Sequence, residues 1–150
     1  MDVTKEIRTR YFQAIKGLEY QDVEIPIFVG FLDDSASLST INGGEVYIVI
    51  QDQQVYDSAT QPYCTYNVTS DITIRVVSKF VKKGTTSIVE DIATEVDNRI
   101  RGTIKKRDEN VIGVGRVRLS VNRLLVENSD THTAYSKILI YQNDLYLTNN

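Results

Sequence analysis

The residue types that could perform chemistry are few in this sequence. The chain of 150 residues contains one histidine, His132, and one cysteine, Cys64. A zinc site needs three or four His, Cys or carboxylate ligands, and histidine phosphoesterase chemistry of the H-x-T type needs two facing histidines. We therefore predict that His132 is a solvated loop residue and that Cys64 is a half-buried structural thiol.

The carboxylates offer no better catalytic arrangement. A two-metal nuclease needs an acid on one strand and an Asp/Glu-x-Lys motif on the next, but the strands carry Glu45 and Asp71 with no such lysine. Asp33 and Asp34 lie in a Ser-rich segment, where a solvated pair of acids is the common case. No Gly-x-Ser-x-Gly elbow is present. We predict no catalytic residue, no metal site and no cofactor, and therefore a protein that is not an enzyme.

Hydrophobic periodicity predicts the elements that would position these residues. Apolar side chains spaced by three and four predict a helix over residues 3–18. A second helix is expected from residue 87, where Ser87 and Glu90 have the spacing of a capping box. Its predicted buried stripe consists of Val89, Ile92, Ala93, Val96, Ile100 and Ile104.

Strands are predicted between and after the two helices. Pro26 makes residues 23–31 an edge strand or an interrupted one. Residues 45–51 read as a strand buried on both faces, and residues 66–76 alternate as a half-buried strand. Polar residues 51–62 are expected to be a connection, and residues 114–126 and 133–141 a hairpin. A turn at 142–144 would separate that hairpin from a short last pairing.

These elements predict one α+β domain spanning residues 1–150. Its mostly antiparallel sheet would carry two helices packed on one face, in the order α-β-β-β-α-β-β. Residues 33–44 are expected to form an exposed loop, since Asn42, Gly43 and Gly44 are turn formers. The longest apolar run, Val46 to Ile50, is far shorter than the roughly 20 residues of a membrane span. We therefore expect that the protein does not contact a membrane. We also expect that it is synthesised in a cytoplasm.

The charge distribution is the unusual feature of the sequence. Residues 99–123 contain eight basic residues and two acidic ones, whereas the whole chain has a net charge of -3. Oppositely charged surfaces on one molecule favour head-to-tail docking of copies. A solvated helix end and strand face explains the same pattern equally well. Phosphate binding, typical of a nucleic-acid-binding accessory protein, is a third interpretation.

Several segments together resemble the tail-terminator and tail-completion proteins of tailed bacteriophages. They are the N-terminal amphipathic helix, the strands at 45–51 and 70–80, the helix at 87–100, and the closing strands at 116–121 and 135–141. The resemblance covers most of the chain, although the 33–44 segment and the lack of tryptophan depart from the family pattern.

The resemblance implies a virion structural protein at the head-tail junction, made in the bacterial host cytoplasm. It would form a homo-oligomeric ring, sixfold or twelvefold, between the tail and the connector or portal-side proteins, with DNA passing through the lumen without sequence-specific binding. We predict subunit contacts at Arg99, Arg101, Arg116 and Arg118. Contacts to other proteins are predicted at Asp33, Asp34, Asn42, Gly43 and Gly44.

Overall fold

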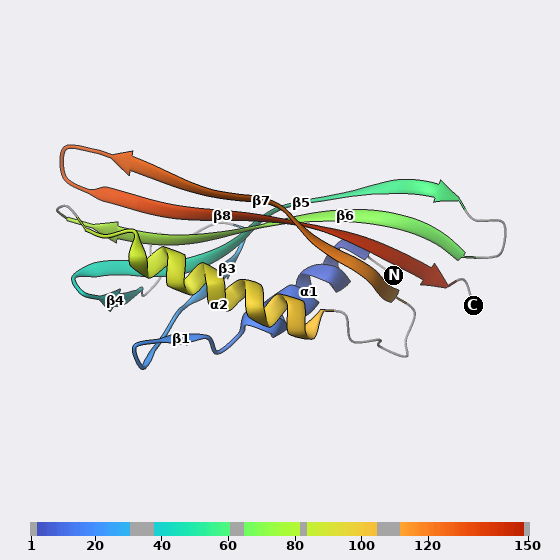
Figure 1. The fold of residues 1–150 in the computed structure, drawn as a ribbon, viewed down its shortest axis with the longest axis horizontal. Helices are drawn as coiled ribbons and strands as arrows, with labels where there is room; N and C mark the ends of the chain where they lie inside the picture. Colours follow the sequence, from blue (N-terminus) through green and yellow to red (C-terminus); the bar gives the residue numbers. More distant parts are fainter. Residues whose placement is uncertain (1–2, 31–37, 61–64, 82–83, 105–111, 149–150) are drawn as a thin grey trace.

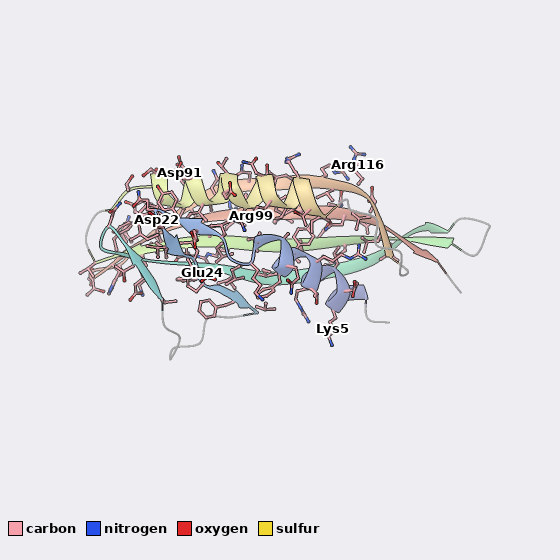
Figure 2. All side chains as sticks on the ribbon, turned by 90° about the horizontal axis from the view of Figure 1, so that it is seen from below. Lys5, Asp22, Glu24, Asp91, Arg99 and Arg116 are labelled. Atoms are coloured by element: carbon pink, nitrogen blue, oxygen red, sulfur yellow. The ribbon has the colours of Figure 1, made fainter. Side chains whose placement is uncertain are left out.

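A computed structural model describes residues 3–30, 38–60, 65–81, 84–104 and 112–148. It has the predicted α+β architecture, in which one twisted sheet carries both helices on the same face. Figure 1 shows the helix layer below the sheet, and the view from below in Figure 2 places both helices in front of the strands. The predicted class and the one-sided helix layer are confirmed.

Four long strands build most of the sheet. They are β5 (Gly44–Thr60), β6 (Thr65–Phe80), β7 (Ile112–Asn128) and β8 (Thr133–Thr148). The strand order is β3-β5-β6-β8-β7, and β4 also pairs with β5. All neighbouring pairs are antiparallel except β3 with β5, which is parallel. The sheet therefore has β7 at one edge and the short strands β3 and β4 at the other.

The remaining strands are short, and they correct the predicted element order. They are β1 (Glu19–Tyr20), β2 (Val23–Glu24), β3 (Ile27–Val29) and β4 (Ser39–Ile41). Six strands, not three, therefore separate the two helices. The break at Pro26 between β2 and β3 was predicted, because proline cannot donate to a strand ladder.

Helix α1 (Val3–Ile15) buries the face that its periodicity predicts. Ile7, Tyr11 and Ile15 are fully buried on it. The helix is followed by Gly17 at φ 78°, a left-handed conformation that glycine adopts without steric cost. Leu18 then turns into the core beneath the sheet.

All six residues of the predicted stripe are buried, five of them within helix α2 (Ser87–Thr103) and Ile104 at its C-cap. Its predicted capping box is wrong, because the N-cap is Thr86 and Ser87 is already helical. The Ser87 amide donates to the Thr85 hydroxyl over 3.2 Å. A capping box requires its Ser or Thr at the N-cap position, so Ser87 lies one residue too late.

The C-terminal part of the loop predicted at residues 33–44 is not a loop, because it contains strand β4 and the start of β5. Asp33 and Asp34 lie outside the described residues. Ser39–Ile41 form β4 because Ile41 is buried in the core and the strand pairs with β5. Asn42 and Gly43, at φ 50° and 82°, make the two-residue turn between the paired residues Ile41 and Gly44. This Asn-Gly turn has the geometry that antiparallel hairpins favour.

Two glycines provide a matched test of these backbone conformations. Gly43→Ala should lower the free energy of unfolding by about 1 kcal/mol, since alanine resists a positive φ. Gly102→Ala, in the last turn of α2 with open space around a new Cβ, should raise it by about 0.5 to 1 kcal/mol. Urea unfolding of both variants measures the two signs. Equal shifts in the same direction would contradict the left-handed turn at Gly43.

Candidate assembly surface

In the described part of the chain, both helices pack on one face of the sheet and the opposite face carries none. Residues on β6 alternate between the two faces, with Ile72, Ile74 and Val76 in the core. Thr73 and Arg75 therefore point to the open face, where they are half-buried. The long strands bring polar and apolar side chains together on this face, and Figure 1 shows its full length above the helix layer.

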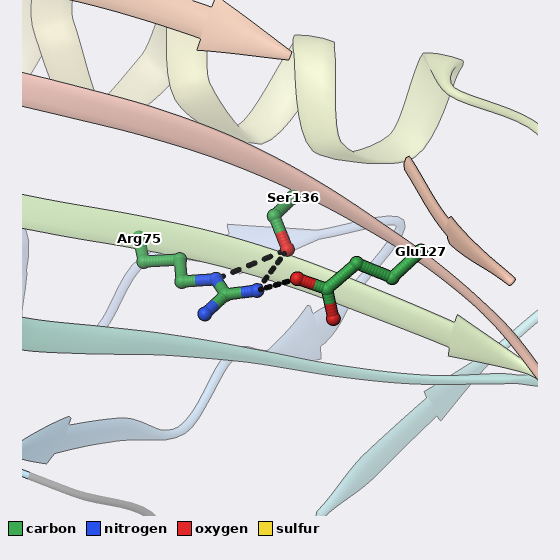
Figure 3. Close-up of polar contacts among 3 residues, drawn as sticks. All are labelled: Arg75, Glu127 and Ser136. Atoms are coloured by element: carbon green, nitrogen blue, oxygen red, sulfur yellow. Dashed lines mark hydrogen bonds and ion pairs between the residues drawn. The ribbon is translucent and has the colours of Figure 1, made fainter. Parts of the chain in front are cut away.

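A polar cluster crosses three strands of the open face, toward the end at which the β7–β8 hairpin turns (Figure 3). The Arg75 guanidinium donates from Nε and Nη2 to the Ser136 hydroxyl, over 3.1 and 2.9 Å. Nη2 also lies 3.4 Å from Glu127 Oε1. Tyr47 lies on the neighbouring strand, and burial raises the pKa of its phenol. Arg75 therefore joins β6 to β8 and β7 through one charged group.

The predicted basic residues fall into two groups. Arg99 and Arg101 lie on α2, whereas Arg116 and Arg118 lie on the edge strand β7. The register places Arg116 opposite Asp144 and Arg118 opposite Gln142, on the open face. Figure 2 shows Arg99 over the helix layer and Arg116 at the β7 edge. The structure does not bring the four arginines into one strip.

The two arginines on α2, Arg99 and Arg101, already form ion pairs within the subunit. Arg99 Nε lies 3.1 Å from Glu95 Oε1, and Arg101 Nε lies 2.8 Å from Asp97 Oδ2. The hydrogen bond with Asp97 raises the pKa of Arg101. Both are i,i+4 pairs of the kind that stabilise a helix by a few tenths of a kcal/mol. Part of the basic charge in this region is therefore neutralised within one subunit.

The arginines on β7 differ from those on α2 in this respect. Among the described residues, Arg116, Arg118 and Arg123 form no ion pair with a carboxylate. Arg118 Nη2 donates to the side-chain oxygen of Gln142. Strand β7 also carries exposed apolar residues, with Val121, Leu124 and Val126 exposed at 36%, 37% and 45%. The β7 edge thus carries its arginines and Val121 on the open face, and the exposed Leu124 and Val126 on the helix-facing side.

Residues considered for catalysis are not brought together. Glu45 pairs with Lys79 and Gln54 with Asp71, so Glu45 and Asp71 lie eight positions apart along the β5–β6 ladder. His132 lies in the turn of the β7–β8 hairpin, where its Nδ1 is 2.8 Å from the Thr131 hydroxyl. Cys64 lies outside the described part of the chain. Glu45 and Asp71 are therefore too far apart to bind one metal ion together.

The described residues contain neither a metal-ligand cluster nor a membrane-spanning helix. Within them, no group of three or more His, Cys, Asp or Glu side chains could hold a metal ion. No helix there is long and apolar enough to cross a membrane. A cavity of about 300 Å³ lies between α2 and the β7–β8 hairpin, lined by Asp97, Leu119 and Lys137 among others.

Sequence reasoning missed a buried polar network between the helices and the sheet. Tyr11 donates its hydroxyl to Asn143 Oδ1, and Asn143 Nδ2 donates to the Ser70 carbonyl over 3.1 Å. Tyr141 donates to Asp97 Oδ1 over 2.8 Å, and its ring packs against Tyr11 at a centroid distance of 5.7 Å. These contacts fix both helices relative to β6 and β8.

Comparisons with known proteins agree with this architecture. No family model matches the sequence, and no curated protein matches it. One solved structure that matches is a chain of the "Virion of native gene transfer agent (GTA) particle". It superimposes with a TM-score of 0.56 at 9% sequence identity, covering 97% of this chain and 99% of that one. The two chains share a fold over nearly their whole lengths.

Proposed function

We propose that this protein is a structural component of a phage-like virion. The observation that carries the proposal is the end-to-end likeness to a chain of a gene transfer agent virion. The match covers 97% of this chain and 99% of that one, so the shared fold extends over nearly the whole of both. The protein would act by binding other subunits, without catalysis and without a cofactor.

The finer proposal is a homo-oligomeric ring at the head-tail junction. Copies that present different surfaces to each other close into a ring when the rotation between them is constant. The arginines on the open face of β7, which form no ion pair among the described residues, and the exposed apolar residues of that strand support such a contact. The ring, sixfold or twelvefold, would join tail proteins to connector or portal-side proteins and let DNA through its lumen. It would be built from chains made in the host cytoplasm.

Native mass spectrometry of the purified chain, over a range of protein and salt concentrations, tests the ring. We expect one closed multimer with a defined copy number that weakens as salt screens the arginine contacts. A chain that stays monomeric over the whole range would contradict self-assembly. Duplex binding by that monomer, with affinity falling steeply in salt, would instead support the nucleic-acid-binding alternative.

A further inference from the structure

We infer that two copies of this chain pair through residues 122–128 of β7, antiparallel and about a twofold axis at Leu125. Strand β7 is an edge strand and, among the described residues, pairs only with β8. Figure 1 shows it as the outermost strand where the β7–β8 hairpin turns. An edge strand leaves a row of main-chain donors and acceptors unpaired on its outer side, and these groups can pair with a strand of another chain.

The two halves of β7 differ in how they protect this edge. The first half contains two register shifts against β8, one after Val114 and one after Leu119. Such bulges are a common protection of an edge strand against pairing with other chains. From Val121 to Asn128 the ladder with β8 is regular. This second half of β7 is therefore the part of the edge that can accept another strand.

The second half of β7 also carries apolar side chains that the subunit leaves uncovered. Leu124 and Val126 are exposed at 37% and 45%, and the register places both on the helix-facing side. Helix α2 packs on β6 and β8, and a cavity lies between it and this part of the β7–β8 hairpin. Removing such apolar surface from water favours a contact with another molecule.

The sequence of this stretch is complementary to itself in the antiparallel direction. When Leu125 lies opposite Leu125 of a second copy, Arg123 lies opposite Glu127 and Leu124 lies opposite Val126. The members of each pair also share a face of the sheet. Arg123, Leu125 and Glu127 lie on the open face, whereas Leu124 and Val126 lie on the helix-facing side. Opposite charges therefore meet on one face and apolar side chains on the other.

Other positions of the axis lose this match. An axis at Leu124 would place Arg123 opposite Leu125 of the second copy. An axis at Val126 would place Leu125 opposite Glu127. In both cases a charged side chain faces an apolar one. The pairs of the described register thus select a second copy of this chain as the partner, and Leu125 as the axis.

Arg123 and Glu127 can both take part in this pair. Arg123 is exposed and forms no ion pair with a described carboxylate. The Glu127 side chain is 58% exposed, and its Oε1 lies 3.4 Å from Arg75 Nη2. A carboxylate has two oxygens with several acceptor positions, so Glu127 can keep Arg75 and accept from a second arginine. Twofold symmetry forms the Arg123–Glu127 pair twice.

The pairing continues the sheet across both copies and leaves room for their helices. An axis perpendicular to the sheet places both helix layers on the same side. Each α2 packs on its own β6 and β8, so the two β7 strands separate the two helices. Arg116 and Arg118 lie outside residues 122–128 and stay available for the ring contact proposed above. The inference goes beyond that contact, because a twofold contact joins copies in pairs and does not propagate around a ring.

Cysteine cross-linking tests the register. In a Cys64→Ser background, Leu125→Cys places two thiols opposite each other, where the Cα atoms of paired strands are about 4.5 to 5.5 Å apart. This separation suits a disulfide. We expect a disulfide-linked dimer of the Leu125→Cys variant under mild oxidation.

Val121→Cys is the matched control for the cross-link. Val121 lies on the same face of β7 and is exposed, whereas Leu125 is half-buried. Exposure alone would therefore favour the control. In the proposed register Val121 lies opposite Ser129 of the second copy, far from the other Val121. Leu125→Cys should cross-link at least about 10-fold faster, because only its thiols meet disulfide geometry. Cross-linking of Val121→Cys at an equal or higher rate would overturn the register.

Charge reversal tests the pairing without a covalent bond. In sedimentation velocity, Arg123→Glu should raise the dissociation constant of the dimer about 10-fold or more, because two pairs of opposite charges become pairs of like charges. Glu127→Lys should act in the same way. An equimolar mixture of the two variants should dimerise again, since each strand then meets its opposite charge. Lys16→Glu, exposed directly after α1, changes the net charge as Arg123→Glu does and should dimerise like the unmodified chain.

The outcomes separate this pairing from the ring. Circular dichroism melts verify that the variants fold. A chain that forms larger multimers but no dimer sensitive to these reversals would overturn the pairing and leave the ring proposal standing. A dimer that neither reversal weakens would also overturn the pairing through β7. A dimer that responds as expected, in a chain that forms nothing larger, would support the pairing and contradict the ring.

Discussion

Replacing Asn143 by alanine should lower the free energy of unfolding by about 3 to 5 kcal/mol. The Asn143 side chain is fully buried and joins the Tyr11 hydroxyl on α1 to the Ser70 carbonyl on β6. Truncation would leave both groups buried without their partner and would open a cavity between helix and sheet. Chemical denaturation with a constant m-value measures the loss.

Gln142→Ala is the matched control for this prediction. Gln142 precedes Asn143 on β8, points to the opposite face and is only half-buried, so its loss should cost less than about 1 kcal/mol. A double-mutant cycle with Tyr11→Phe isolates the bond itself, because residues that share a buried hydrogen bond are not additive. Additive losses for Tyr11→Phe and Asn143→Ala would show that the two side chains do not depend on each other.

Local periodicity predicted those elements whose buried face can be recognised from the spacing of nearby residues in the sequence. The stripes of α1 and α2, the alternation of β6 and the Asn42–Gly43 turn are all of this kind. Each depends on neighbours three, four or two positions away along the chain. The sequence therefore sufficed for the class of fold and for the one-sided helix layer.

The extent of the long strands could not be predicted in the same way. Residues 51–60 are polar and were expected to be a connection, yet they continue β5 because β6 pairs with most of that length. The expected turn at 142–144 is likewise part of β8. Asn143 tolerates a buried strand position only because Tyr11, 132 residues earlier, binds its side chain. A local sequence pattern cannot indicate a partner that lies 132 residues away along the chain.

The sequence predicted which charged residues the candidate assembly surface contains, but not how the fold arranges them. The excess of basic residues after position 99 was visible in the sequence, but pairing of Arg99 and Arg101 with acids one helical turn earlier divides it. The proximity of three acids, Glu19, Glu24 and Asp91, was not predicted either, because the β1–β2 hairpin and the Tyr20–Asp91 bond bring them together. A charge count along the chain does not show which charges pair within one subunit.

Alkaline pH should unfold the protein through Tyr11 and Tyr141. Burial is the main cause that raises the pKa of both phenols above the usual value of about 10, and for Tyr141 the hydrogen bond to Asp97 adds to it. The folded state therefore holds both phenols neutral, whereas the unfolded chain releases their protons above pH 10. Their contribution to stability is fully present below about pH 10. Above that pH it falls by up to about 1.4 kcal/mol per pH unit for each tyrosine.

Urea unfolding at pH 9, 10 and 11 measures this slope for the unmodified chain and for Tyr11→Phe and Tyr141→Phe. Each replacement should remove the contribution of its own phenol to the slope, because phenylalanine has no proton to release. Tyr20→Phe is the comparison: the hydrogen bond to Asp91 raises the pKa of Tyr20 as well, but at an exposed contact that solvent screens, so its loss should change the slope less than either core replacement. An unchanged slope in both core variants would mean that the buried phenols ionise without unfolding the protein. The network that fixes the helices to the sheet would then be open to water.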